Sequence, residues 1–191
     1  MEIYFATKNF GKVISVKNVL SAYGINVIHV PLELPEPRSD DLKMITRDKV
    51  VFAYQQIQKP CIVQDAGFYI HSLNGFPKAF VNFTLETIGI EGILKLAEGK
   101  SRECEFRNCL AYIDDSMSEP KYFESGVKGR LADAPRGELR DYQWSELWLI
   151  FIPENENRTI AEMTHQEYLD WRTLRDKETF STKFAKWFKN L

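Results

Sequence analysis

The chain has 191 residues, of which 44% are hydrophobic and 27% are charged, with a formal net charge of -2 and a sequence pI near 6.0. This composition is typical of an ordinary folded chain and excludes a disordered one. The balanced charge argues against a nucleic-acid-binding or anionic membrane surface, because such surfaces rest on clustered Lys and Arg. No apolar run approaches the roughly 20 residues of a membrane span. We therefore expect a cytoplasmic protein with no nucleic-acid partner and no membrane partner.

The N-terminal residues predict a strand, a polar turn and a helix. Residues 2–6 are apolar, residues 7–12 form the turn, and the helix that follows has one apolar face. The free N–H groups at the start of such a helix favour an anion, and Thr7, Asn9 and Lys12 add a hydroxyl, an amide and a cation. These residues are candidate phosphate ligands. The alternative is a capped helix with a solvated lysine, because short polar turns often precede helices.

A second strand is expected at residues 25–30, where His29 is interpreted as a strand histidine without a role in chemistry. Three prolines between residues 31 and 37 exclude regular structure there. An acid-rich loop then leads into a helix that runs to about residue 58, and Ser39 or Asp40 can cap this helix.

Residues 61–77 contain the candidate catalytic residue. The β-branched pair at 62–63 is followed by Asp65 and Gly67. Such a pattern is typical of a buried strand that delivers a carboxylate to a cleft where the backbone bends. We expect a strand, Asp65, a bend, a second strand at 69–73, and a tight turn at Asn74-Gly75.

The remaining residues predict a helix over 85–97, a hairpin of strands at 104–112 and 122–130, and helices at the C-terminus. Strands and helices alternate early, and strands pair by a hairpin later. This order indicates an α/β fold: a long mixed central sheet flanked by helices, with a cleft between two lobes of a single domain over residues 1–191.

Several of these motifs resemble those of one family. The run Val-Gln-Asp-Ala-Gly-Phe at 63–68, followed by Leu-Asn-Gly-Phe-Pro at 73–77, looks like the core motif of the inosine triphosphate pyrophosphatase family. Residues 7–12 are similar to its Thr-x-Asn-x-x-Lys turn, and residues 151–153 with 159–163 resemble its C-terminal signature. The chain is therefore identified as a divergent, archaeal-type member of this family.

This resemblance implies a function. The family hydrolyses noncanonical purine nucleoside triphosphates, namely ITP, XTP and dITP, to a monophosphate and pyrophosphate with Mg²⁺ or Mn²⁺, and it implies a homodimer. By resemblance, Asp65 is the catalytic and metal-binding residue. The nucleotide-binding residues implied in the same way are Thr7, Asn9, Lys12, Gly67, Phe68, Trp144 and Arg175.

Some positions depart from the family's pattern. Gln64 and Ser15 stand where relatives carry acids, and Lys78 replaces a glycine. Trp148 stands at the position of an aspartate, and Tyr168 stands near the position of a lysine. Each change removes a group that the resemblance assigns to metal, phosphate or backbone approach.

The second helix also departs from the pattern. Counting back from Asp65 puts Val51 at the position of the family's phosphate-binding lysine. Lys49 lies two positions away, about 200° around the helix, and is not expected to substitute for that lysine.

Two hypotheses are left open by the sequence. Hydrolysis at the α-phosphorus needs charge neutralisation, an oriented water and a carboxylate, which Asp65 cannot supply by itself. The protein is either a nucleoside triphosphate pyrophosphatase that has rebuilt its site with the loop acids Glu36, Asp40 or Asp41, or a noncatalytic nucleotide-binding or structural relative. An assay of pyrophosphate release separates the two.

Overall fold

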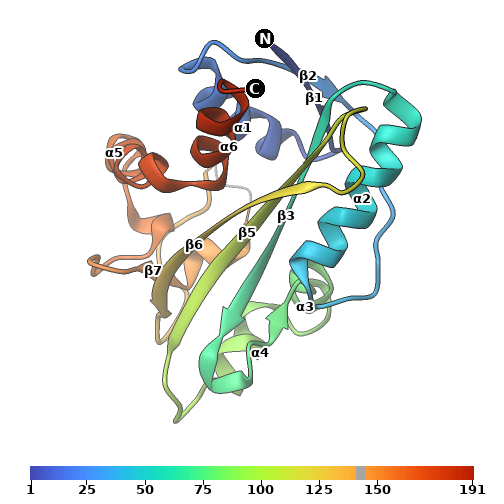
Figure 1. Ribbon diagram of the computed structural model, residues 1–191. Coiled ribbons are helices and arrows are strands. Elements are labelled where there is room, and N and C mark those ends of the chain that lie inside the picture. The colour runs from blue at the N-terminus through green and yellow to red at the C-terminus, as the bar shows by residue number, and fades with distance from the viewer. Residues whose placement is uncertain (141–144) are drawn as a thin grey trace. The chain divides into compact units, whose positions relative to one another are not determined.

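The computed structural model describes residues 1–140 and 145–191, apart from the side chain of Asp176 (Figure 1). The strands are β1 (Glu2–Ala6), β2 (Asn26–Val30), β3 (Cys61–Ile70), β4 (Pro77–Lys78), β5 (Glu103–Ile113), β6 (Lys121–Leu131) and β7 (Phe151–Pro153). The α-helices are α1 (Phe10–Ser21), α2 (Leu42–Ile57), α3 (Val81–Thr87), α4 (Gly89–Leu96), α5 (His165–Arg175) and α6 (Phe180–Phe188).

The strands form one sheet in the order β2-β1-β3-β5-β6-β7, with β4 paired to β3. The sheet is mixed, because β1 is parallel to β2 and β3, whereas β3 pairs with β4 and β6 with β7 in antiparallel fashion. The expected α/β fold with a long mixed sheet and flanking helices is thereby confirmed.

Contacts divide the chain into two compact units. Unit 1 contains residues 1–66, 108–125 and 175–191, and unit 2 contains residues 67–107 and 126–174. Strands β3, β5 and β6 each contribute residues to both units. The single two-lobed domain with a cleft stays a prediction.

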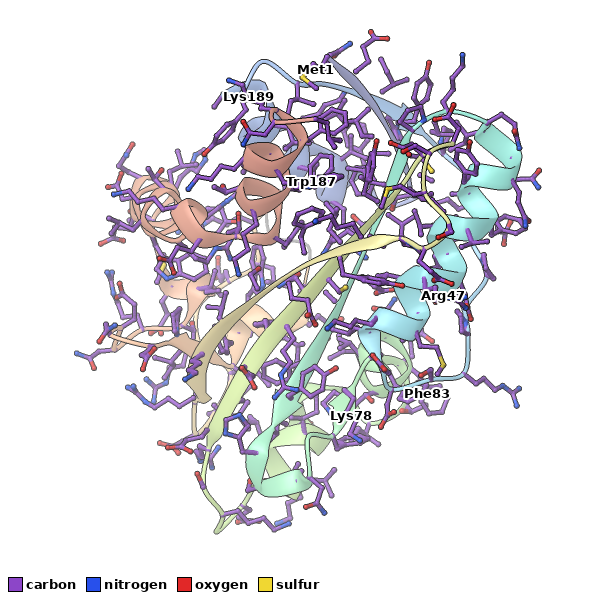
Figure 2. The ribbon with its side chains drawn as sticks, viewed as in Figure 1. Met1, Arg47, Lys78, Phe83, Trp187 and Lys189 are labelled. Atoms are coloured by element: carbon purple, nitrogen blue, oxygen red, sulfur yellow. The ribbon has the colours of Figure 1, made fainter. Side chains whose placement is uncertain are left out.

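Unit 1 is built on both faces of its part of the sheet (Figure 1). Alternate residues of a strand point to opposite faces, so Ile3 and Phe5 of β1 pack with α1 and α6, while Ala6 packs with α2. Trp187 of α6 packs against the first of these clusters (Figure 2). Helices α1 and α2 therefore cover opposite faces of the same strands.

Both of these helices begin at a capping side chain. Asn9 Oδ1 accepts a hydrogen bond from the Lys12 N–H at 3.0 Å and so caps α1. The cap of α2 is Asp41, whose Oδ1 accepts from the Lys43 N–H at 2.8 Å. The expected cap at Ser39 or Asp40 was therefore wrong by one or two positions. Asp41 is the cap because its extended backbone directs its carboxylate to the first turn of α2.

Strand β3 differs from the expected strand, bend and second strand. It runs without interruption from Cys61 to Ile70, and residues 71–73 form a 3₁₀ turn instead of a strand. Gly67 is required for close approach: a Cβ atom there would lie 2.7 Å from the Lys78 carbonyl oxygen of β4. The tight turn at Asn74-Gly75 is confirmed, since both residues have positive φ angles of 54° and 84°.

Unit 2 has a core of its own. The rings of Phe68, Phe106 and Phe151 pack together. The centroid of Phe106 lies 4.7 Å from that of Phe68 and 4.8 Å from that of Phe151. Trp148 is also buried there and packs against Tyr168 at 5.6 Å. Of the helices in residues 1–140 and 145–191, none has both the length and the apolar character to span a membrane.

Candidate functional site

The site in unit 1 forms where β1 ends and its neighbour β3 continues. The two strands are parallel, with Phe5 opposite Ile62, and β1 ends at Ala6. Asp65 lies three residues beyond Ile62, so its part of β3 extends past the carboxyl end of β1. Ligands of open α/β sheets collect outside the carboxyl ends of parallel strands.

The turn after β1 brings the first lysine to this position. The Asn9 N–H donates to Thr7 Oγ1 at 3.1 Å, and Asn9 in turn caps α1. Two residues into the helix, Lys12 extends its ammonium to the Gln64 carbonyl oxygen at 3.0 Å and lies 3.8 Å from Asp65 Oδ1. The structure thus brings together four predicted site residues, Thr7, Asn9, Lys12 and Asp65, within unit 1.

The second lysine is Lys49, which was not expected to reach the site. Lys49 Nζ donates to Asp65 Oδ2 at 2.6 Å and to Glu36 Oε2 at 2.8 Å. The side chain of Lys49 is only 8% exposed, whereas Val51 packs with the apolar cluster around α2. The structure therefore contradicts the expectation that Lys49 lies on the wrong face of α2 to reach Asp65, whereas its contact with phosphate stays a proposal.

A signal for Lys49 was present in the sequence. The buried residues of α2 recur at helical spacing, and Lys49 stands on that stripe between Ile45 and Ala53. A lysine on an apolar stripe is seldom buried unless it is paired, so its position called for a buried acid. Asp65 is that acid.

The charges of these side chains are coupled. Burial raises the pKa of Asp65, but Lys12 and Lys49 lower it by more, so the pKa lies below its ordinary value. Burial lowers the pKa of Lys49, but Asp65 and Glu36 outweigh that effect and the net pKa is raised. For Lys12, burial outweighs the attraction of Asp65, and the pKa is lowered. At neutral pH the Asp65–Lys49 pair is therefore fully ionised.

The lowered pKa of Asp65 predicts an acid-sensitive part of the stability. An unfolded aspartate has a pKa of about 3.9, so the folded carboxylate stabilises the protein above that value and loses this contribution as pH falls toward its lower folded pKa. We expect the difference in unfolding free energy between wild type and Asp65→Asn to shrink below about pH 4. Urea denaturation at a series of pH values measures it. Asp48→Asn, on the exposed face of α2, is the control, and a constant difference for Asp65→Asn would contradict the prediction.

The acids present fit one kind of metal site and not another. In residues 1–140 and 145–191, no group of three or more His, Cys, Asp or Glu side chains is arranged to hold a metal ion. Asp65 and Glu36 are nevertheless joined through one ammonium group. Mg²⁺ is usually bound by one or two carboxylates, with phosphates and water as its other ligands. The pair therefore fits a cation that arrives on a phosphate ligand, and does not fit a cation held by protein groups alone.

Gln64, named above as a departure from the family's pattern, and the other predicted site residues have different surroundings. The Gln64 amide donates to Asn108 Oδ1 at 3.0 Å, on the face of β3 opposite Asp65. Phe68 is fully buried in unit 2, so any nucleotide contact there rests on its backbone, and Gly67 is packed against β4. Trp144 lies outside the described residues, and Arg175 is the last residue of α5.

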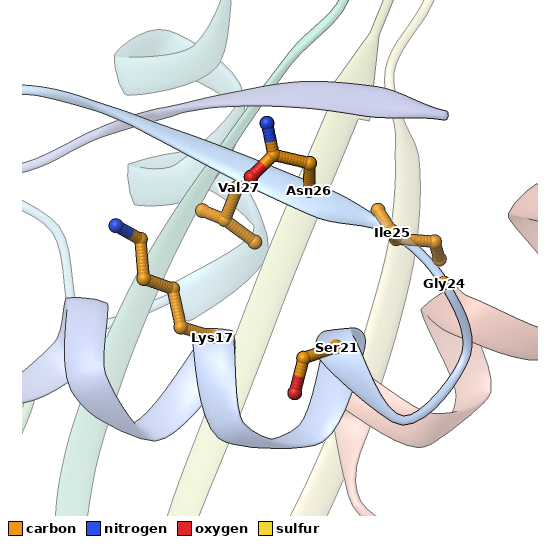
Figure 3. Close-up of a pocket in the computed structure, with 6 residues that line it drawn as sticks. All are labelled: Lys17, Ser21, Gly24, Ile25, Asn26 and Val27. Atoms are coloured by element: carbon orange, nitrogen blue, oxygen red, sulfur yellow. The ribbon is translucent and has the colours of Figure 1, made fainter.

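A hollow of about 360 Å³ lies elsewhere in unit 1 (Figure 3). It is lined by Lys17 and Ser21 near the C-terminal end of α1 and by residues 24–27 at the start of β2. The turn that contains Thr7 and Asn9 lies at the other end of α1, so this hollow is separate from the site around Asp65.

Comparison with known proteins gives consistent matches. The model of the Ham1 family matches residues 3–171. A dITP/XTP pyrophosphatase of Methanopyrus kandleri is 37% identical over 191 residues, which cover 100% of this chain and 97% of that protein. One of Saccharolobus solfataricus is 38% identical over 168 residues, covering 87% and 84%. The solved structure of a HAM1 protein from Coxiella burnetii has a TM-score of 0.82 at 20% identity and covers 100% of both chains, which supports the fold alone.

Proposed function

The chain belongs to the Ham1 family, and from this premise we propose that it hydrolyses noncanonical purine nucleoside triphosphates to a monophosphate and pyrophosphate. Its relatives named dITP/XTP pyrophosphatase support XTP and dITP as substrates. The resemblance of its motifs to the inosine triphosphate pyrophosphatase family supports ITP as a third substrate. The observation that carries the proposal is the convergence of Lys12 and Lys49 on Asp65 beside the turn before α1. A triphosphate needs this combination of cations and free N–H groups.

Each residue then has a distinct role. Lys12, Lys49 and the turn that contains Thr7 and Asn9 bind and orient the phosphates, because they offer cations and hydrogen-bond donors. Asp65 remains ionised, as its lowered pKa requires, and orients a water molecule toward the α-phosphorus. The water oxygen bonds to the α-phosphorus while the bond from this phosphorus to the oxygen that bridges to the β-phosphate breaks. Pyrophosphate leaves with the bridging oxygen, the monophosphate keeps the water oxygen, and the proton of the water passes by way of Asp65 to solvent.

A divalent cation, Mg²⁺ or Mn²⁺, belongs to this proposal. When bound, it would neutralise charge on the triphosphate, and Asp65 and Glu36 are the carboxylates that would hold it. Lys49 now stands between these two carboxylates. With both acids holding a cation, Lys49 would supply a further positive charge beside the phosphates.

We favour an active enzyme over a noncatalytic relative for one structural reason. The family's pattern includes a lysine and an acid that this sequence lacks at the matching positions. At the site, Lys49 supplies a second buried cation, and Glu36 supplies a second acid from the proline-rich loop. Groups that act as a unit lose most of their effect when one is missing, so their presence together favours catalysis.

The remaining parts of the proposal concern residues and properties beyond the unit 1 site. We propose Gly67, Phe68, Trp144 and Arg175 as further nucleotide-binding residues, a homodimer, a single two-lobed domain and a cytoplasmic location. The family motifs support these residue assignments. The balanced charge supports the expectation that the protein has no nucleic-acid partner and no membrane partner.

Pyrophosphate release tests the proposal directly. The purified chain is assayed with dITP, XTP and ITP, and with ATP and GTP for comparison, in Mg²⁺, in Mn²⁺ and in EDTA. We expect release from the first three nucleotides, much slower release from ATP and GTP, and loss of release in EDTA. Tight calorimetric binding of XTP with negligible release would instead favour the noncatalytic relative.

The variant Lys49→Met tests whether Lys49 is the second phosphate-binding lysine, as the structure indicates, although counting back from Asp65 placed that position at Val51. Methionine keeps most of the side-chain volume and removes the ammonium that lies on Asp65 and Glu36. We expect kcat/KM for XTP to fall about 100-fold, as for loss of one preorganised charged contact. Val51→Ala is the matched control from the same helix and is expected to keep kcat/KM within about threefold, since Val51 packs in the apolar cluster. Equal losses in both variants would contradict the assignment.

A further inference from the structure

His29 contacts the phosphate-binding turn directly. It lies on β2, where Phe5 of β1 is its neighbour in register, and its ring is half-buried. His29 Nε2 lies 2.8 Å from the Thr7 carbonyl oxygen. A carbonyl oxygen can only accept a hydrogen bond, so Nε2 carries the hydrogen and donates it.

This hydrogen bond determines the direction of a second group. The Thr7 carbonyl and the Lys8 N–H belong to one planar trans peptide and point in opposite directions. With the carbonyl held toward β2, the Lys8 N–H points away from β2. Within residues 1–140 and 145–191, no acceptor for this N–H group is found, and the Lys8 side chain is turned to Glu33 at 2.8 Å.

The same imidazole also contacts the first residue of the helix that follows the turn. Phe10, the first residue of α1, packs edge-on against His29 with ring centroids 6.2 Å apart and an interplanar angle of 62°. Phe10 is 65% exposed, so most of its side chain faces solvent. His29 therefore contacts both Thr7, which starts the turn, and Phe10, which starts the helix that follows it.

We propose that His29 is a positioning residue for phosphate binding: by holding the Thr7 carbonyl and packing against Phe10, it directs the Lys8 N–H to a phosphate oxygen of the nucleotide. This role rests on the proposed function, because the turn is taken as the phosphate-binding element. It adds a backbone donor to the cation of Lys12, and it depends on a side chain that does not itself contact the phosphate.

Variants of His29 test the role. His29→Leu removes the donor, whereas His29→Gln keeps an N–H donor of similar reach. We expect His29→Leu to raise KM for XTP and the Kd for inorganic pyrophosphate about three- to tenfold with little change in kcat, as for one lost hydrogen bond made equally in both states. His29→Gln should recover most of this loss. Ile28→Ala, a half-buried neighbour on β2, should lower Tm without changing either constant.

A spectroscopic measurement keeps the test independent of how the variants fold. In wild type at neutral pH, ¹⁵N shifts of the His29 ring should show hydrogen on Nε2, and titration with inorganic pyrophosphate should move the Lys8 amide resonance strongly. Hydrogen on Nδ1 alone, an unmoved Lys8 amide, or a His29→Leu variant with wild-type pyrophosphate affinity would each overturn the proposal. Pyrophosphate binding is measured without turnover, so an inactive wild type would refute the proposed function while leaving the His29 role testable.

Discussion

Asp65→Asn is expected to lower kcat for pyrophosphate release by about 1,000-fold, the upper range for removal of one group preorganised for the transition state. Asparagine has the size of aspartate but lacks the charge, so it cannot hold the Lys49 ammonium at 2.6 Å as an ion pair or polarise a water molecule. The loss should appear in kcat and in kcat/KM alike, measured with XTP and dITP in Mg²⁺.

Phosphate binding provides the discriminating control for this variant. Asp65→Asn leaves Lys12 and Lys49 in place and removes an anion from beside them, so inorganic pyrophosphate should bind at least as tightly as to wild type when no metal is present. Calorimetry in EDTA measures this affinity. Activity within about tenfold of wild type would remove Asp65 from the chemistry, since a catalytic carboxylate is worth more than that.

The largest effect on stability is expected from Gly67→Ala. A Cβ atom at Gly67 would lie 2.7 Å from the Lys78 carbonyl oxygen and 3.0 Å from its carbonyl carbon, and 2.8 Å from Tyr69 Cε2. The first two are backbone atoms of the paired strand β4, so no side-chain rotation relieves the overlap. We expect a loss of about 3 kcal/mol in the free energy of unfolding, at the upper end for an overpacked core position.

Gly126→Ala is the matched control for Gly67→Ala. Gly126 lies within β6, and a Cβ atom there would approach the Phe106 carbonyl oxygen only to 3.3 Å. Neither glycine has a positive φ angle, so the two substitutions differ in space and not in backbone strain. Urea denaturation should show Gly126→Ala within about 1 kcal/mol of wild type. Equal stability of the two variants would refute the assigned role of Gly67.

Features that depend on neighbouring residues in the chain were predictable from the sequence. The polar turn after β1 and the apolar face of α1 follow from local sequence and helical spacing, although the helix begins at Phe10 and so includes residues 10–12, which were expected in the turn. The turn at Asn74-Gly75 follows from the need for positive φ angles. The proximity of Lys12 and Asp65 follows from the parallel pairing of β1 and β3, because parallel strands place their carboxyl-end turns at one edge of the sheet.

The sequence by itself therefore determined the α/β class and the strand, turn and helix that carry Thr7, Asn9 and Lys12. The tertiary structure decided the rest of the site: the pairing of Lys49 with Asp65 and Glu36, the continuity of β3 through Gly67, and the contact of His29 with Thr7. These depend on how α2 packs on the sheet, where β4 pairs and how β2 aligns with β1. Such contacts join residues that are 11 to 22 positions apart in the sequence. Helical or strand periodicity specifies which face of one element is buried, but not which other element packs against that face. Periodicity therefore could not predict these contacts.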